Sequence, residues 1–338
     1  MNKYALTPVV LDNIANIERL YGQLEVLRIP KKLQLNLERD NLIQSSFISN
    51  SIEGNPLSYP EVSNLLLGDR LPANRSEKEV RNYFEILKSL EQRAKKPFNI
   101  DGILALHRDL MTRVDDDIAG QIRDSRVVIG NRKISGKKIK IIVKHEPPHH
   151  DAESIKKALG DLIEWFNGTN EVLPVIKIAL FHHLYVFIHP FADGNGRTVR
   201  LLTALLLIKA GYAVNKYFVL DDYYDVDRLA YSDALHSADA GRSTQWVEYF
   251  TSGIKYSLQS ALSKTKNALL TMRVDERPSE RQRQVLEIFA SNSELTSAEV
   301  ASALGVSRQQ AQNLLAGLVQ KGLVKKIGRT KKSYYQIA

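Results

Sequence analysis

The sequence predicts a mainly α-helical fold with one β-hairpin, followed by a smaller C-terminal domain that mixes helices and strands. Apolar residues recur at three- and four-residue steps through most of residues 9–265, as on the buried face of an amphipathic helix. The stretch 126–143 instead carries two β-branched runs on either side of a turn. Pro278 precedes a final segment with a pattern of its own. The expected parts are an N-terminal helical region at 1–95, a helical core at 96–265 and a separate domain at 278–338.

Four helices are expected in the first 95 residues, and a fifth opens the core. Leu11, Ile14 and Ile17 begin a helical repeat that Pro30 ends, because proline lacks the amide hydrogen that a helix interior needs. Gly54 offers a left-handed cap to the second helix. The predicted helices run from residue 9 to before Pro30 and over 32–53, 59–67, 77–94 and 99–114.

A β-hairpin is expected next, with strands at Arg126–Gly130 and Lys138–Val143 and turn residues at Ser135-Gly136. Pro147-Pro148 ends it, and helical periodicity then returns. The predicted helices cover residues 152–167, 173–188, 195–210, 226–238 and 244–265. Residues 266–277 carry mixed charge and are expected to be a linker.

The last domain reads as three helices and two strands around a basic turn, which is typical of a winged helix-turn-helix. The helices are expected at 280–291, 296–304 and 307–321 and the strands at 323–327 and 333–337. From Pro278 onward nine Lys and Arg face four acidic residues, and six of the nine lie between Lys321 and Lys332. This placement suits contact with a nucleic-acid backbone. Binding to a protein, or dimer formation, is the open alternative.

Composition excludes several classes of protein. The chain has 338 residues, 43% of them hydrophobic and 25% charged, which rules out wholesale disorder. It has no cysteine, so disulfides, thiolate metal sites and thiol nucleophiles are excluded. Its formal net charge is +9. The N-terminus lacks the long apolar run of a signal peptide, and the most apolar stretch, 201–210, is too short to span a bilayer. We therefore expect a cytoplasmic protein without a membrane anchor.

The chemistry is concentrated in one stretch, His189-Pro190-Phe191-Ala192-Asp193-Gly194-Asn195-Gly196-Arg197-Thr198-Val199-Arg200. A glycine-rich loop that leads into a helix N-terminus is an anion site. Arg197 and Arg200 share one face of the first turn, where they oppose the helix dipole unless an anion lies between them. Asp193 offers a hard oxygen ligand for Mg²⁺, and His189 is a candidate general base.

Each of these features alone is typical of a turn or of a structural histidine, but their combination is not. The stretch resembles the signature of the Fic family, His-Pro-Phe-x-(Asp/Glu)-Gly-Asn-Gly-Arg-x-x-Arg, at every fixed position. The resemblance covers about three quarters of the chain, to about residue 265, and implies a Fic-fold helical bundle with a β-hairpin flap. Gly120-Gln121-Ile122-Arg123 resembles the family's Gly-x-x-Arg. The hairpin resembles the flap that aligns a target protein by strand addition.

The resemblance implies transfer of AMP from ATP to a Ser, Thr or Tyr hydroxyl of a protein, with release of pyrophosphate. His189 would take the hydroxyl proton, and Asp193 would hold Mg²⁺. The backbone of Gly194, Asn195 and Gly196 would cradle phosphate oxygens. Arg197 and Arg200 would stabilise the β- and γ-phosphates. Such chemistry depends on positioning and charge stabilisation.

A second motif, Ser49-Asn50-Ser51-Ile52-Glu53-Gly54, resembles the family's inhibitory helix, (Ser/Thr)-x-x-x-Glu-(Gly/Asn). Ser49 and Glu53 lie four residues apart on one helix face, and a carboxylate at a helix C-terminus is disfavoured unless a cation offsets it. The resemblance implies that Arg200 is that cation, so that Glu53 blocks placement of the γ-phosphate. In some members the same glutamate positions a water for removal of AMP, and this alternative stays open.

Two softer candidates lie farther along the chain. Tyr231-Ser232-Asp233-Ala234-Leu235 resembles the family's Tyr-Tyr-x-x-Leu segment at the adenine pocket, although Ser232 replaces the second tyrosine. Asp239 falls where a polar residue often contacts the nucleoside. Packing between helices is the alternative for Tyr231. Two functional hypotheses remain: an adenylyltransferase with an appended winged helix, or a DNA-binding regulator whose core senses nucleotide.

Overall fold

The computed structural model describes residues 3–68, 70–135, 138–214, 216–271, 278–290, 292–328 and 333–338. The chain divides into two compact units. The first comprises Met1–Glu25 and Glu38–Leu262, and the second comprises Val26–Leu37 and Ser263–Ala338. Each unit is described here by itself. Within the described residues, every helix is too short or too polar to cross a membrane.

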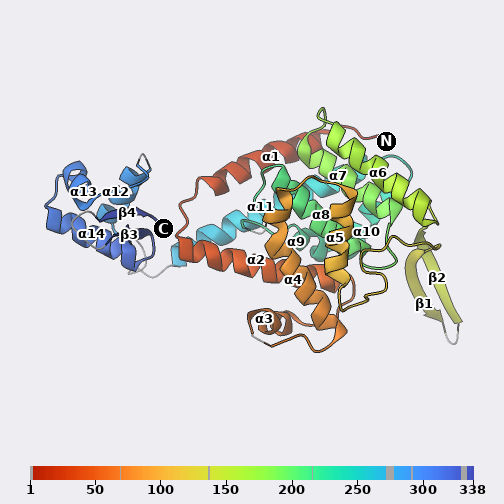
Figure 1. The fold of residues 1–338 in the computed structure, drawn as a ribbon. Coiled ribbons are helices and arrows are strands. Elements are labelled where there is room, and N and C mark those ends of the chain that lie inside the picture. The colour runs from red at the N-terminus through yellow and green to blue at the C-terminus, as the bar shows by residue number, and fades with distance from the viewer. Residues whose placement is uncertain are drawn as a thin grey trace. The chain divides into compact units, whose positions relative to one another are not determined.

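The first unit is built from helices, as predicted (Figure 1). The helices that lie wholly or mostly in it are α1 (Pro8–Glu25), α2 (Lys31–Ile52), α3 (Tyr59–Leu67), α4 (Arg75–Ala94), α5 (Ile100–Met111), α6 (Ala152–Gly168), α7 (Pro174–Ile188), α8 (Asn195–Lys209), α9 (Asp221–Val226), α10 (Arg228–Ser237) and α11 (Thr244–Thr271).

Helix α8 forms the centre of this unit. Residues 197–207 are all buried, so the helix has no face exposed to solvent along most of its length. A helix that is apolar all round must be enclosed by other elements. Helices α7 and α4 supply most of that enclosure. Asn195 at the N-terminus of this helix is also buried, whereas Lys209 at its C-terminal end is exposed.

The hairpin consists of β1 (Ile129–Ser135) and β2 (Lys138–His145), which pair antiparallel with Ile129 opposite His145. It extends from one edge of the helical body (Figure 1). The predicted first strand, 126–130, began too early. The carbonyl oxygen of Ser125 accepts a hydrogen bond from Arg123 Nη1 at 2.6 Å, so the chain just before Arg126 is held by a side chain rather than by a partner strand. Gly136 of the predicted turn lies outside the described residues.

Two further predictions about the chain up to residue 277 were wrong. The expected single helix at 226–238 is two helices, α9 and α10, because Asp227 adopts extended backbone and its carboxylate caps α10 by accepting from the Ala230 amide at 2.9 Å. The expected linker at 266–277 begins later, since α11 continues to Thr271. Residues 266–271 contain no glycine or proline, so nothing local stops the helix. The rest of that predicted linker, 272–277, lies outside the described residues.

The second unit contains the winged helix-turn-helix that the sequence predicts. Its elements are α12 (Glu280–Phe289), α13 (Ser297–Leu304), α14 (Arg308–Gln320), β3 (Val324–Ile327) and β4 (Tyr334–Ile337). Ser279, Thr296 and Ser307 each form a capping box with the residue three positions on. The core side chains are Val285, Phe289, Leu295, Val300, Ala311, Leu315, Leu318, Val324 and Tyr335. The basic residues Arg329, Lys331 and Lys332 lie outside the described residues.

Candidate functional site

His189 ends α7 with an unusual backbone conformation. Its φ and ψ are 52° and 65°, in the left-handed region that few non-glycine residues adopt. Arg123 holds it there: Arg123 Nε donates to the His189 carbonyl oxygen at 2.7 Å, and Nη2 donates to the carbonyl oxygens of Ile188 at 3.3 Å and His149 at 2.7 Å. A strained residue fixed by its surroundings is typical of a functional site. The Gly-x-x-Arg segment therefore supports the backbone of the candidate base.

Burial lowers the pKa of His189 to about 4, and the charges of Arg123 and His145 act in the same direction. The imidazole is therefore neutral at pH 7 and able to accept a proton. Its Nδ1 is buried, so a substrate can reach the ring only at Nε2. These properties suit a general base that acts on a hydroxyl group.

The loop between α7 and α8 is held by its own side chains. Asn195 Oδ1 accepts from the Phe191 amide at 3.0 Å, and Asn195 Nδ2 donates to the Phe191 carbonyl at 2.7 Å. His107 stacks on the Phe191 ring, with centroids 3.6 Å apart, and hydrogen-bonds the Asp193 carbonyl oxygen. Gly194 has φ +78° and packs so closely on His107 and Met111 that a larger residue would be crowded. The loop is thus rigid before any ligand binds.

Arg197 is buried at the start of α8 and is paired with carboxylates. Its Nη1 lies 3.3 Å from Glu79 Oε1 and its Nη2 lies 3.6 Å from Asp193 Oδ1. Asp193 also lies 3.2 Å from Arg75 Nη2, and its side chain remains 47% exposed. The neighbouring amide of Gly194 donates to Asp193 Oδ1 at 2.6 Å. Asp193 is therefore accessible, although two arginines already contact it.

Arg200 and Glu53 form the ion pair that the sequence predicts. Arg200 Nη2 lies 2.8 Å from Glu53 Oε1, and the guanidinium is also fixed by Ser49, whose hydroxyl and carbonyl oxygens accept from it at 2.7 and 2.8 Å. Burial lowers the pKa of Arg200, but the charge of Glu53 together with those of Tyr231, Tyr83 and Asp221 raises the pKa above its usual value. Ser49 is buried, whereas the Glu53 side chain is 38% exposed.

The Glu53 carboxylate also sits on the backbone at the start of α8. A Cβ atom added to Gly196 would overlap Glu53 Oε1 and would lie 3.2 Å from Arg200 Nη1. Only glycine leaves room for an anion at this position. Arg200 therefore binds a carboxylate of the chain itself, and this carboxylate lies against the first turn of α8, where an anion site is expected. A phosphate group has the charge and hydrogen-bonding capacity to replace it.

The same residues fit a magnesium nucleotide. Mg²⁺ takes oxygen ligands and is commonly bound by one or two carboxylates together with substrate phosphates. Asp193 supplies an accessible carboxylate beside the anion site, as the distances above establish. Asp193 therefore offers one carboxylate ligand that suits Mg²⁺, and the binding of Mg²⁺ stays a prediction.

Tyr231 and Asp239 occupy different settings. Tyr231 is buried, stacks on Tyr224 with centroids 4.3 Å apart and hydrogen-bonds His182 Nε2 through its hydroxyl at 3.0 Å. Burial raises the pKa of Tyr231 to about 12. This packing agrees with the structural alternative, and contact with adenine stays a prediction. The carboxylate of Asp239 is engaged by histidine side chains, one of them His183 Nε2 at 2.9 Å. A nucleoside contact by Asp239 also stays a prediction.

Sequence reasoning missed two contributors to the site. Glu79 and Arg75 lie on α4, more than a hundred residues before the loop that they contact. Neither carries a local pattern that sets it apart from the other charges of an amphipathic helix. His107, on α5, also supports the site: it stacks on Phe191 of the loop and accepts the Gly120 amide at Nδ1, 3.0 Å away.

Comparison with protein families agrees with both resemblances. Residues 97–207 match the Fic/DOC family, and residues 278–331 match the MarR family. The first match contains the His189–Arg200 motif and the second contains the helix-turn-helix. The mainly helical fold, the Fic domain and the winged-helix domain predicted from the sequence are thereby confirmed.

The curated proteins that this chain is similar to include protein adenylyltransferases. Protein adenylyltransferase fic-1 of Caenorhabditis briggsae is 28% identical over 230 residues, which are 64% of this chain and 41% of the relative. Protein adenylyltransferase Fic of Aedes aegypti is 31% identical over 183 residues, 52% of this chain and 34% of the relative. The chain therefore spans about two fifths or less of the length of these curated relatives.

Solved structures share the fold. A Fic family protein from Desulfovibrio desulfuricans G20 is 25% identical with a TM-score of 0.66, and the match covers 100% of this chain and 98% of that one. Fic-1 of Caenorhabditis elegans, residues 134–508, gives a TM-score of 0.64 at 23% identity and covers 77% and 74% of the two chains.

Proposed function

We propose that this chain, which contains a Fic/DOC-family domain and a MarR-family winged-helix domain, is a protein adenylyltransferase that is inhibited by its own Glu53. It would transfer AMP from ATP to a hydroxyl group of a protein and release pyrophosphate. The observation that carries this proposal is the juxtaposition of a neutral, buried His189 with an anion site in which Glu53 contacts Arg200 at 2.8 Å. The names of the relatives support the same activity.

In the proposed reaction the substrate hydroxyl oxygen attacks the α-phosphorus of ATP. A bond forms between that oxygen and phosphorus, the bond to the bridging α–β oxygen breaks, and pyrophosphate leaves. His189 Nε2 takes the hydroxyl proton, which its low pKa permits because the ring is neutral at pH 7. Arg197, Arg200 and the amides at the start of α8 stabilise the phosphates, while Asn195 keeps the loop in place. Such positioning is the main source of catalysis in phosphorus transfer.

Mg²⁺ would be held by Asp193 and would neutralise phosphate charge. The carboxylate is close to Arg197 and Arg75, so it is oriented before the metal arrives. The β1–β2 hairpin would align the target segment by strand addition, as its two-stranded antiparallel form permits.

Glu53 would inhibit by occupying the phosphate position. Its carboxylate and a phosphate oxygen would compete for Arg200 and for the space above Gly196. Because Glu53 follows the last residue of α2 and precedes Gly54 with φ +86°, a change of backbone at the helix end would withdraw it. The chain would then be active only after that withdrawal.

Mass spectrometry of the Glu53→Gly protein incubated with ATP and Mg²⁺ tests the proposal. We expect an added AMP on the chain itself or on a co-incubated protein, at a higher level than with the unaltered chain. His189→Ala in the Glu53→Gly background is expected to abolish the adduct. An adduct that persists without His189, or a Glu53→Gly protein that forms none, would refute the activity. Adding the unaltered chain to modified protein separates inhibition from AMP removal, since only removal erases an existing adduct.

We also propose that the winged helix binds DNA. Arg308, Gln309 and Gln310 are exposed at the N-terminal end of α14, where a recognition helix meets base edges. Lys325 and Lys326 are exposed on β3 and suit phosphate contact. The match to the MarR family supports this assignment.

A mobility-shift titration against salt tests DNA binding. Replacing Lys325 and Lys326 by glutamate is expected to weaken binding and to reduce the salt slope by about 1 for each lost phosphate contact. Lys157→Glu, an exposed lysine of α6, is the matched control. Affinity and salt slope that are the same in all three proteins would contradict the proposal and favour a protein partner.

A further inference from the structure

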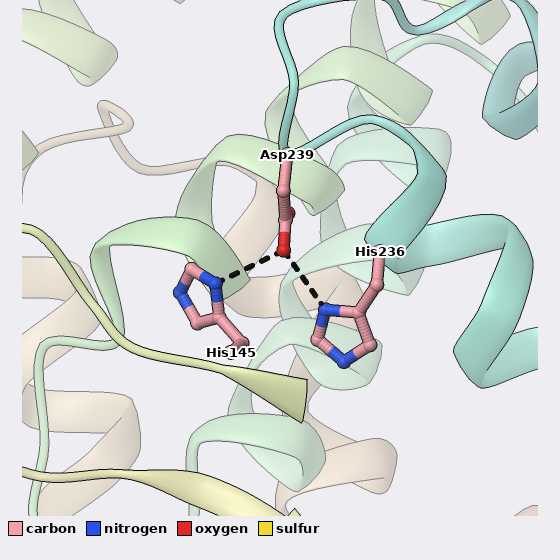
Figure 2. A group of neighbouring side chains, drawn as sticks. All are labelled: His145, His236 and Asp239. Atoms are coloured by element: carbon pink, nitrogen blue, oxygen red, sulfur yellow. Dashed lines mark hydrogen bonds and ion pairs between the residues drawn. The ribbon is translucent and has the colours of Figure 1, made fainter. Parts of the chain in front are cut away.

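A second polar cluster lies near the candidate base His189 and includes Asp239, for which a nucleoside contact stays a prediction. It consists of His145 at the end of β2, His236 on α10 and Asp239 just after α10 (Figure 2). Asp239 Oδ2 lies 3.0 Å from His145 Nδ1 and 3.1 Å from His236 Nδ1. One donor atom from each residue falls within 4.8 Å of the other two. The fold therefore brings two imidazoles and a carboxylate together from positions about ninety residues apart.

The hydrogen bonds of His145 leave an electrostatic conflict inside this cluster. Its Nε2 lies 3.0 Å from the carbonyl oxygen of Phe187, which can only accept, so Nε2 carries the proton. In the neutral ring, Nδ1 then presents a lone pair to Asp239 Oδ2 at 3.0 Å. Two acceptors at that distance repel each other unless a cation lies between them. The cation is either a second proton on His145 or a metal ion.

The surroundings match those of a metal site. A histidine that binds a metal usually donates its other ring hydrogen to a backbone carbonyl or a carboxylate, which fixes the tautomer. The bond from His145 to the Phe187 carbonyl has this form. Ligating carboxylates are themselves hydrogen-bonded, and Asp239 Oδ1 lies 2.9 Å from His183 Nε2. His145 is buried, whereas His236 and Asp239 are half-buried, so the arrangement is shielded from bulk water on one side and open to a water ligand on the other.

We propose that His145, His236 and Asp239 bind one divalent transition-metal ion of the zinc type. Two imidazole nitrogens and one carboxylate oxygen suit Zn²⁺ and its neighbours, whereas Mg²⁺ and Ca²⁺ prefer sets of oxygen ligands. Tetrahedral ligands at about 2.0–2.1 Å from the ion lie about 3.4 Å apart. The two spacings to Asp239, 3.0 and 3.1 Å, would widen by a few tenths of an ångström, and a ring nitrogen of His145 lies within 4.8 Å of one of His236. Water would complete the coordination.

Such an ion would join three parts of the first unit. His145 ends the hairpin, His236 and Asp239 belong to the α10 region, and the Phe187 carbonyl lies two residues before His189. The metal ion would fix the end of the hairpin to the helical body, close to His189, the candidate general base. This role is independent of the proposed transferase activity, and it uses nitrogen ligands that the Mg²⁺ site lacks.

Isothermal titration of the full, tag-free chain with Zn²⁺, after removal of metal with EDTA, tests the proposal. We expect one Zn²⁺ per chain and a higher melting temperature in its presence. His145→Gln and His236→Gln are each expected to weaken binding at least tenfold. His150→Gln is the matched control, because His150 is exposed and lies outside the cluster. Millimolar Mg²⁺ is expected not to displace the ion.

The half-buried His236 keeps the test decisive if substitution of the buried His145 prevents folding. One-to-one Zn²⁺ binding that His236→Gln weakens and His150→Gln preserves would support the site. Absence of Zn²⁺ binding by the unaltered chain would overturn it and assign a second proton to His145. Zn²⁺ binding that is equal in His236→Gln and in the unaltered chain would overturn it as well, because the ion would then lie elsewhere.

Discussion

Replacing Glu53 by glycine is expected to tighten ATP binding by about 5- to 30-fold. The carboxylate accepts one charge-assisted hydrogen bond, 2.8 Å long, from an Arg200 side chain that is only 2% exposed. Bonds of this kind contribute about 1.5–3 kcal/mol, and the partial exposure of Glu53 reduces this to about 1–2 kcal/mol. ATP no longer has to displace that contact in the variant. Each 1.4 kcal/mol is a factor of about ten in affinity, which gives the stated range.

The same substitution is expected to destabilise the chain when nucleotide is absent. Arg200 keeps its hydrogen bonds to Ser49 but loses its only carboxylate partner among the ion pairs of the described residues. A buried charge without a partner lowers the free energy of unfolding. The melting temperature of the variant should therefore fall without ATP, while the rise on addition of Mg²⁺ and ATP should be larger than in the unaltered chain.

Isothermal titration with ATP and Mg²⁺, paired with thermal melts, measures both effects. Glu53→Gln is the graded control, because glutamine keeps the shape and an acceptor oxygen but removes the charge. Glu25→Gly, at the exposed end of α1, is the matched control for a glutamate-to-glycine change at a helix end. Equal ATP affinity in Glu53→Gly and in the unaltered chain would refute competition between Glu53 and the phosphates.

Three further predictions follow from the loop and the base. Asn195→Ala removes both hydrogen bonds to the Phe191 backbone and leaves buried groups unpaired, so the free energy of unfolding should fall by about 2–4 kcal/mol. Urea titrations measure this loss, and a loss below about 0.5 kcal/mol would contradict the prediction. The auto-modification rate should stay level from pH 8 to about 5 and fall as His189, with its pKa of about 4, gains a proton; an apparent pKa near 6.5 in initial rates would contradict the assignment. In the Glu53→Gly background, Gly196→Ala should weaken ATP binding at least tenfold in calorimetry, because the methyl group fills the position of the anion. Unchanged ATP affinity would show that the phosphate does not bind above Gly196.

The parts of the fold that local chemistry controls could be predicted. Helix α3 was expected at 59–67 and is found at Tyr59–Leu67, because the Ser58 capping box and the glycine that follows mark both ends. The break at Asp227 was missed because an aspartate inside a helical pattern is equally compatible with a continuous helix. Only its cap on Ala230 reveals that one helix ends and another begins.

In the candidate site, the contiguous motif could also be predicted, whereas contacts between separate elements could not. The motif from His189 to Arg200 is contiguous, so the order of its residues already indicates a loop that leads into a helix. The acid that pairs with Arg197 comes from α4, and no local pattern can tell Glu79 from its neighbours. The three-histidine arrangement on Asp239 was missed for the same reason, since its members lie on separate elements.

At the start of α8, the proposed inhibition and the stability of the fold depend on one contact. Two buried arginines there would be costly without anions, and the chain supplies a carboxylate for each: Glu79 for Arg197 and Glu53 for Arg200. Glu79 is 13% exposed and Glu53 38%, so Glu53 is the partner that a phosphate can replace at lower cost. Asp193, at 47%, is exposed enough to take Mg²⁺ instead of leaving. In the proposed function, the acid that inhibits the chain is therefore also the one that offsets the buried charge of Arg200 before ATP binds.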